Sequence, residues 1–304
     1  MWCDVLASAR TVALGPVAGV PIVHELSDGI ELEGRDAVPW SGTDSLGSPV
    51  LIRHEVGDAT PSGMRAVLHV PPWCTFHLDE AGEPASLFHA VFGEVDRLLS
   101  CAVPGAEYVV RYASPPREPV VALQSELTAF SFALSARGSG LIAHSCAFVA
   151  PNGSGVLCPG VSGTGKTTLA RLLLERPDVS VLTDDRAIVT VDDTGVTAWG
   201  SPWPGAARVA SGDSARVSTV VFIRHGSACG AREMTPGDAF RRIVNTLSMP
   251  LWEPARCGAA LEIVDALVTR TRLVEIAFPP TPTGASWVLD VVQQSVPLGR
   301  LDAR

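Results

Sequence analysis

Gly160-Val-Ser-Gly-Thr-Gly-Lys166-Thr167-Thr168 fits the pattern G-x-x-x-x-G-K-[ST], and the elements around it follow from this motif. Loops of this pattern wrap the phosphates of a nucleotide with their backbone N–H groups. Residues 155–158 predict a strand before the loop, and residues 168–176, with leucines at helical spacing, predict a helix after it. The N-terminal amides of that helix would face the phosphates. The predicted phosphate contacts come from Gly160, Ser162, Gly163, Thr164, Gly165, Lys166, Thr167 and Thr168.

Lys166 is the only lysine among the 304 residues, whereas arginine occurs throughout the chain. A planar guanidinium does not replace a compact ammonium that lies between two phosphates. The single position that keeps lysine is therefore the position where a phosphate-binding loop needs it.

The composition disfavours several classes of protein. The formal net charge is -9 and no Lys/Arg stripe is present, so duplex nucleic acid is not an expected partner. No run of about 18 apolar residues occurs, which argues against a membrane span, and residues 1–9 lack the basic start of a signal peptide. The seven cysteines are scattered without a C-x-x-C pair, which disfavours zinc and disulfides and favours a reducing cytoplasm.

Residues 1–119 are predicted to form a small α+β domain to which the sequence assigns no chemistry. Residues 67–70 and 108–112 are typical of strands, and residues 87–99, with apolar side chains on one face, are typical of a helix. The proline-rich stretch Ser114-Pro-Pro-Arg-Glu-Pro119 is expected to end this domain. Residues 120–137 are then predicted to be a connecting helix, capped by Gly138.

Residues 138–304 are predicted to form a nucleotide-binding domain. Thr235-Pro236-Gly-Asp238 has a cap residue, a proline and an acid in the order that opens a helix. Two further helices are expected over residues 260–268 and 287–292. Strands are expected over residues 141–150, 179–185, 187–191, 196–199, 217–223 and 273–278.

Asp184 and Asp185 follow the predicted strand that comes after the loop helix. A strand that runs parallel beside the loop strand would bring both carboxylates to the nucleotide. Adjacent residues at a strand end point to opposite sides, so one can face a magnesium ion and the other the attacking group. The alternative is an ordinary solvated acidic turn, because aspartates are common in loops.

These motifs resemble a known family. The loop through Leu169, followed by Leu182-Thr-Asp184-Asp185, is similar to the phosphate loop and aspartate pair of HPr kinase/phosphorylases and ATP-dependent phosphoenolpyruvate carboxykinases. Gly200-Ser-Pro-Trp-Pro-Gly205 and the stretch from Met234 to Pro254 resemble shorter HPr kinase-like proteins. The resemblance covers residues 138–295. It implies an α/β fold with a P-loop kinase core of this type and a mixed sheet, preceded by the smaller α+β domain.

The resemblance implies ATP, or another nucleoside triphosphate, and Mg²⁺ as cofactors. The implied reaction phosphorylates a serine-type hydroxyl of a peptide, protein or small molecule. Lys166 and the loop amides would hold the phosphates, Thr167 and Asp185 the magnesium, and Asp184 would be the base. His144 would support the phosphates or the acceptor, although a lone histidine in an apolar strand is more often a core residue.

Three departures from the family pattern matter. The chain lacks the proline- and arginine-rich loop that HPr kinases use for phosphorolysis and for contacting HPr. This absence disfavours phosphorylase activity and disfavours HPr as the substrate. Ala206-Ala207 follow Gly205 where related proteins usually have a glutamate. A single lysine does not supply the cluster with which carboxykinases bind oxaloacetate.

Two other functions stay open at this stage. One is a nucleotide-responsive binding protein that phosphorylates nothing, and the other is a carboxykinase-like metabolic enzyme. The sequence does not identify the acceptor, the preferred nucleotide or the oligomeric state, and a homo-oligomer is compatible with it.

Overall fold

The computed structural model describes residues 10–28, 30, 48–70, 74–88, 96–115, 123–248 and 254–293. These residues divide between two compact units, with the main boundary between Arg137 and Gly138. Each unit is built on one eight-stranded sheet. The predicted mixed α/β class is therefore confirmed.

The sheet of the first unit has the strand order β1-β2-β3-β8-β7-β6-β5-β4. The pairs β2–β3 and β3–β8 are parallel, and the other neighbours are antiparallel. Buried and half-buried residues alternate along β2, as expected where one face of a sheet packs on a core. The strands are β1 (Arg10–Val17), β2 (Val20–Leu26), β3 (Val50–Val56), β4 (Arg65–Val70), β5 (Cys74–Leu78), β6 (Pro84–Phe88), β7 (Arg97–Val103) and β8 (Glu107–Tyr112).

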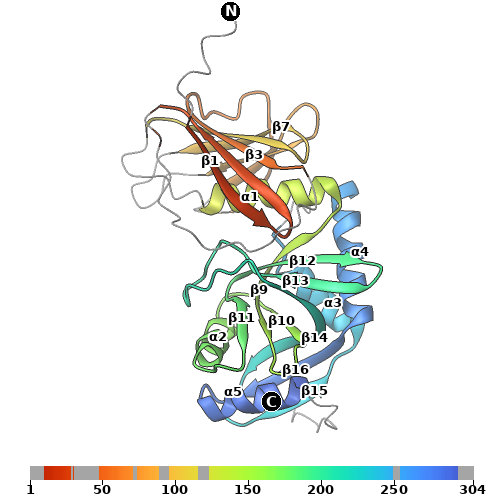
Figure 1. The fold of residues 1–304 in the computed structure, drawn as a ribbon. Helices are drawn as coiled ribbons and strands as arrows, with labels where there is room; N and C mark the ends of the chain where they lie inside the picture. The colour runs from red at the N-terminus through yellow and green to blue at the C-terminus, as the bar shows by residue number, and fades with distance from the viewer. Residues whose placement is uncertain are drawn as a thin grey trace, which may run out of the picture. The chain divides into compact units, whose positions relative to one another are not determined.

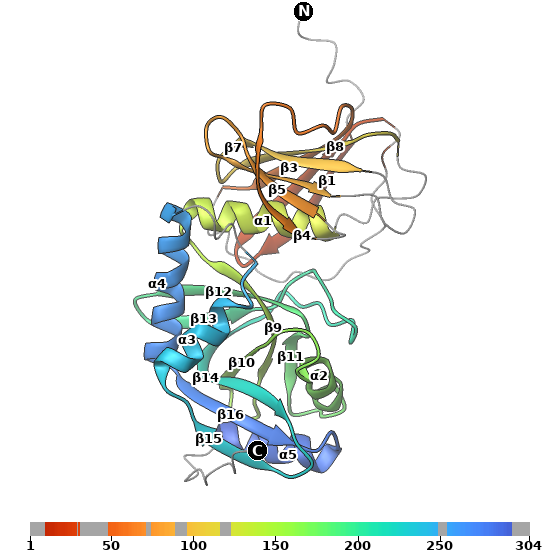
Figure 2. The same cartoon turned by 180° about the vertical axis from the view of Figure 1, so that it is seen from behind.

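Helix α1 (Leu123–Arg137) lies across one face of this sheet (Figure 2). Its aromatic side chains Phe130 and Phe132 are fully buried. Arg137, in its last turn, donates from Nε to the carbonyl of Gly105 at 2.7 Å. The predicted helix over residues 120–137 thus packs as part of the first unit.

The predicted helix over residues 87–99 is wrong. Leu87 belongs to β6 and residues 97–99 belong to β7, which pair with each other in antiparallel register, while residues 89–95 lie outside the described part of the chain. Apolar side chains at helical spacing also fit two strands joined by a loop, and here strand pairing decides. The strands predicted over residues 67–70 and 108–112 are confirmed as β4 and β8.

The second unit has the strand order β10-β9-β12-β13-β14-β16-β15, and β11 pairs with β9. Because β10 also pairs in parallel with β14, five of these strands close into a ring. The sheet is mixed, as predicted. The strands are β9 (Leu141–Val149), β10 (Gly155–Pro159), β11 (Ser180–Thr183), β12 (Arg186–Asp192), β13 (Gly195–Trp199), β14 (Ser214–His225), β15 (Gly230–Glu233) and β16 (Arg272–Phe278).

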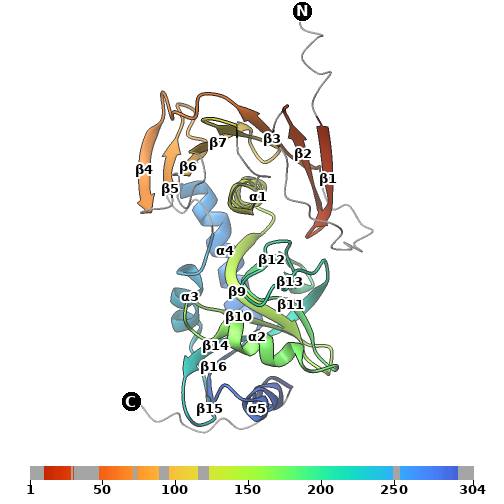
Figure 3. The ribbon, with the colours of Figure 1, turned by 90° about the vertical axis from the view of Figure 1, so that its left-hand side faces the viewer.

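Helices cover the second sheet on both sides, with α2 and α4 on opposite sides of it (Figures 1 and 3). Helices α2 (Lys166–Leu174) and α5 (Pro282–Gln293) contribute to one buried apolar cluster. Helices α3 (Pro236–Val244) and α4 (Pro254–Arg270) contribute to the other. The three predicted helices beyond Thr235 are confirmed, and the Thr235 hydroxyl caps α3 by accepting from the amide of Asp238.

Strand β9 lies between β10 and β11, which corrects the expectation that β11 directly adjoins the loop strand. Both β10 and β11 are antiparallel to β9, and Ala147 is paired with Leu157 on one side and Thr183 on the other. Since β10 and β11 therefore run in the same direction, the phosphate loop and the aspartate pair follow strand ends that lie at the same end of β9. Strand β9 contributes the residues between the phosphate loop and the aspartate pair.

No helix in the described parts of the chain is long and apolar enough to cross a membrane. Some sequence predictions fall wholly or partly outside the described residues. They concern residues 1–9, the proline-rich stretch at 114–119 and the motif at 250–254.

Candidate functional site

The phosphate loop connects β10 to α2 in the order that the sequence predicts. Gly163 and Gly165 have φ values of 85° and 104°, a region that glycine adopts without the steric penalty of a Cβ. Gly165 is also the residue before α2, and no side chain caps the helix there. The first amides of α2 thus stay available to a phosphate group, which a helix N-terminus favours.

Lys166 starts α2, and its side chain is buried in the loop. Its Nζ donates to the carbonyls of Gly160 at 2.6 Å and Val161 at 2.9 Å. An ammonium has three donors, so one is left for a phosphate oxygen. Burial lowers the pKa of Lys166, and the negative charge of Asp185 opposes that shift.

His144, on β9, links the phosphate loop to the aspartate pair. Its carbonyl accepts from the amide of Gly160 at 3.1 Å, and the next amide, of Ser145, donates to the carbonyl of Asp185 at 2.9 Å. The imidazole Nε2 lies 2.9 Å from Oδ1 of Asp185. The structure thus brings together the histidine, the aspartate and the loop.

Asp185 is the charged centre of this group. Its Oδ2 lies 2.9 Å from Nη1 of Arg186, which the sequence analysis did not select. Burial raises the pKa of Asp185, but the hydrogen bond from His144 and the charges of Arg186, His144 and Lys166 outweigh it, so the pKa lies below its usual value. With Asp185 ionised, Nε2 of His144 donates to it, and only in the neutral imidazole is Nδ1 a proton acceptor.

Asp184 has a different environment from its neighbour, because its side chain is fully buried. Its Oδ1 accepts from the amides of Gly205 at 2.9 Å and Val209 at 3.2 Å, and its Oδ2 accepts from the amide of Ala207 at 2.7 Å. A carboxylate held by three amides and shielded from solvent is not placed to receive a proton from an incoming hydroxyl. These contacts favour a positioning role for Asp184 over the predicted role as base.

Several supporting residues were missed by the sequence analysis. Arg171 of α2 donates from Nη2 to the carbonyl of Ala206 at 2.9 Å, and His225, at the end of β14, has Nε2 2.7 Å from the carbonyl of Gly163. No local motif marks either residue, because both act on backbone carbonyls of distant segments. Trp203, in the motif between Gly200 and Gly205, is buried, which favours a packing role.

The chemistry of the predicted metal ligands suits a magnesium ion. Thr167 and Asp185 offer a hydroxyl and a carboxylate, which are oxygen ligands of the type that Mg²⁺ prefers. Asp185 is 29% exposed, and each of its oxygens has a second lone pair beyond its contact with His144 or Arg186. Among the described residues no group of three or more His, Cys, Asp or Glu side chains converges. A Mg²⁺ ion bound with a nucleotide does not need one, because phosphate oxygens and waters complete its shell.

No protein-family model matches the chain, and no curated protein matches its sequence.

Proposed function

We propose that the protein is an ATP-dependent kinase that transfers the γ-phosphate to a serine-type hydroxyl of a peptide, protein or small molecule. The observation that carries this proposal is the His144–Asp185 pair, with Nε2 and Oδ1 2.9 Å apart, hydrogen-bonded through the backbone of β9 to the phosphate loop. A phosphate loop alone indicates nucleotide binding. A loop joined to a histidine–carboxylate pair also has a group that accepts a proton.

The phosphate loop binds the donor nucleotide in this proposal. The uncapped amides of α2 and the third N–H of Lys166 contact the phosphate oxygens. Thr167 and Asp185 would hold Mg²⁺, and the ion would neutralise charge that develops on the transferring phosphoryl group. The HPr kinase-like core inferred from the sequence has these parts.

The acceptor hydroxyl loses its proton to Nδ1 of His144, and Asp185 stabilises the resulting imidazolium through Nε2. The acceptor oxygen forms a bond to the γ-phosphorus while the bond from that phosphorus to the bridging oxygen breaks, releasing the nucleoside diphosphate. Asp184 takes no proton and instead fixes the backbone of residues 205–209.

The test is transfer of labelled γ-phosphate from ATP with magnesium to serine-containing peptides, free serine and the protein itself. The variants are Lys166→Ala, His144→Gln, Asp185→Asn and Asp184→Asn. The proposal expects transfer to fall by about 10²-fold or more in each of the first three variants. If Asp184→Asn folds like wild type and still loses transfer without a change in nucleotide affinity, the base is Asp184.

A second function is favoured by one observation. Residues 205–209 present backbone amides and alanines, Ala206 and Ala207, at the place where a carboxylate would help to bind a metal or an acceptor. A nucleotide-responsive binding protein needs only the phosphate loop. It would bind ATP in calorimetry, label no acceptor and change its hydrogen-exchange pattern on binding.

A further inference from the structure

Residues 205–209 form a short loop that is held on several sides. Asp184 accepts from three of its amides, and Arg171 of α2 donates to the carbonyl of Ala206. The amide of Arg208 donates to the carbonyl of Gly205 at 3.0 Å, which closes a β-turn. The backbone of this loop is thus fixed by the residue that follows β11 and by α2 at the same time.

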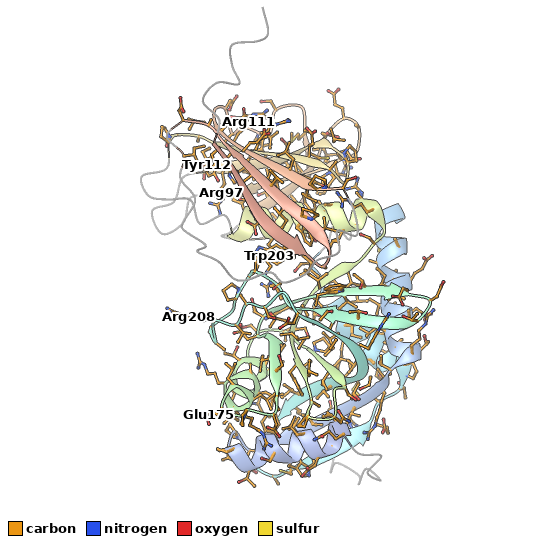
Figure 4. All side chains as sticks on the ribbon, viewed as in Figure 1. Arg97, Arg111, Tyr112, Glu175, Trp203 and Arg208 are labelled. Carbon is orange, nitrogen blue, oxygen red and sulfur yellow. The ribbon has the colours of Figure 1, made fainter. Side chains whose placement is uncertain are left out.

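Arg208 has a φ of 59°, and among the described residues only Ala18 is another non-glycine with positive φ. This conformation is unfavourable for a residue with a Cβ and persists only where surrounding contacts impose it. The side chain of Arg208 is exposed, and its guanidinium has no ion pair within the described parts of the chain. Figure 4 shows Arg208 on this loop of the second unit. The fold therefore imposes an unfavourable backbone on a residue whose charge is not used internally.

The loop lies against Asp185. A Cβ built on Gly205 would lie 2.6 Å from the Cβ of Asp185, and a β-turn separates its first and last Cα atoms by less than about 7 Å. Arg208 therefore starts one turn away from the carboxylate that contacts His144.

We propose that Arg208 binds the γ-phosphate of the nucleotide, and that Asp184 and Arg171 are positioning residues that hold the loop for this contact. The inference rests on the proposed function, because it assumes that a nucleotide triphosphate occupies the phosphate loop. A guanidinium binds two phosphate oxygens at once, which Lys166 does not. Arg208 thereby gives the site a higher affinity for a nucleoside triphosphate than for the diphosphate.

The experiment measures the affinities of the full chain for ADP and for the non-hydrolysable analogue AMP-PNP, with magnesium, by isothermal titration calorimetry. Arg208→Asn and Arg208→Gly both remove the charge, and both residues tolerate positive φ. Arg241→Gln, on the exposed face of α3, removes an arginine charge away from the site. We expect about a tenfold or greater loss of AMP-PNP affinity for both Arg208 variants, with ADP affinity within about twofold.

Arg171→Gln releases the loop without touching the phosphate, so a smaller loss for AMP-PNP alone is expected. A melting temperature of Arg208→Gly at or above that of wild type shows that the loss does not come from unfolding. Equal changes for ADP and AMP-PNP, or no change for either, overturn the role of Arg208. Neither outcome contradicts the proposal that the chain binds a nucleotide. A wild-type protein that binds neither nucleotide overturns the proposed function itself.

Discussion

Nε2 of His144 lies 2.9 Å from Oδ1 of Asp185, and the amide of the next residue, Ser145, donates to the carbonyl of Asp185. The side chains and the backbones of the two segments are thus held together. A histidine fixed in this way needs no rearrangement before it accepts a proton. The pair is also joined to the phosphate loop through the amide of Gly160.

His144→Gln tests the proton acceptor without removing the metal ligand. Glutamine can still donate to Asp185 but has no basic nitrogen, so transfer is expected to fall about 10²- to 10⁴-fold while ATP affinity stays within a few fold. Single-turnover transfer and calorimetry measure the two quantities. Equal losses in transfer and in nucleotide affinity would instead assign His144 to binding.

Lys166→Arg tests whether the loop needs an ammonium. The side chain is buried and donates to two carbonyls of its own loop, so a larger planar group does not fit there. Nucleotide affinity is expected to fall about as far as in Lys166→Ala, by tenfold or more. Calorimetry with ADP and ATP measures it, and retention of wild-type affinity would contradict the predicted geometry.

The sequence predicts the second unit well because local sequence signals determine where several of its helices and strands begin and end. The phosphate-loop pattern fixes β10 and α2, and a cap residue fixes the start of α3. In the first unit, residues 87–99 lack such signals, and their apolar side chains fit a helix or two strands equally well. Only the pairing of β6 with β7 decides between them, and pairing between strands is a tertiary property.

The sequence does not distinguish the roles of the two aspartates, because they are adjacent residues of the same type. The structure separates Asp184, which is fully buried and held by amides, from Asp185, which is 29% exposed beside His144. The partners of Asp184 come from residues 205–209, more than twenty positions away. No local sequence pattern indicates that a carboxylate binds the backbone amides of a distant loop.

Gly205→Ala is expected to displace the loop that Asp184 holds. The new Cβ would lie 2.6 Å from the Cβ of Asp185 and 2.7 Å from Oδ2 of Asp184, which is too close for both atoms. We expect a loss of about 1–3 kcal/mol of unfolding free energy, together with loss of transfer.

Gly237→Ala is the matched control, because nothing lies within 4 Å of a Cβ at that position in α3. Alanine is favoured over glycine in a helix by roughly 0.5–1 kcal/mol, so this variant should be at least as stable as wild type. Urea titration monitored by hydrogen exchange of the second unit measures both variants. Equal stabilities of the two variants would contradict the close approach at Gly205.

A buried polar chain in the first unit connects the sheet to α1. Nδ1 of His24 lies 2.9 Å from Nε2 of His54, whose Nδ1 lies 3.0 Å from the hydroxyl of Tyr112. Nε2 of His24 lies 3.0 Å from a carboxylate oxygen of Glu126 in α1. All four side chains are at most 2% exposed. His24 thus lies between His54 and Glu126 of α1, and His54 lies between His24 and Tyr112 of β8.

The first unit is expected to lose stability in mild acid because of His54. Burial, together with the charges of His24 and Arg97, lowers the pKa of His54 to about 3, whereas the unfolded chain binds a proton near pH 6.5. The unfolded state thus holds more protons between these values, so the stabilising contribution is complete above about pH 6.5 and falls by about 1.4 kcal/mol per pH unit below it. Hydrogen exchange of β3 amides at pH 7.5 and pH 5 measures the loss, about 2 kcal/mol. His54→Gln should be less stable at pH 7.5 but show a flatter pH dependence; an unchanged slope in this variant would assign the acid sensitivity to other groups.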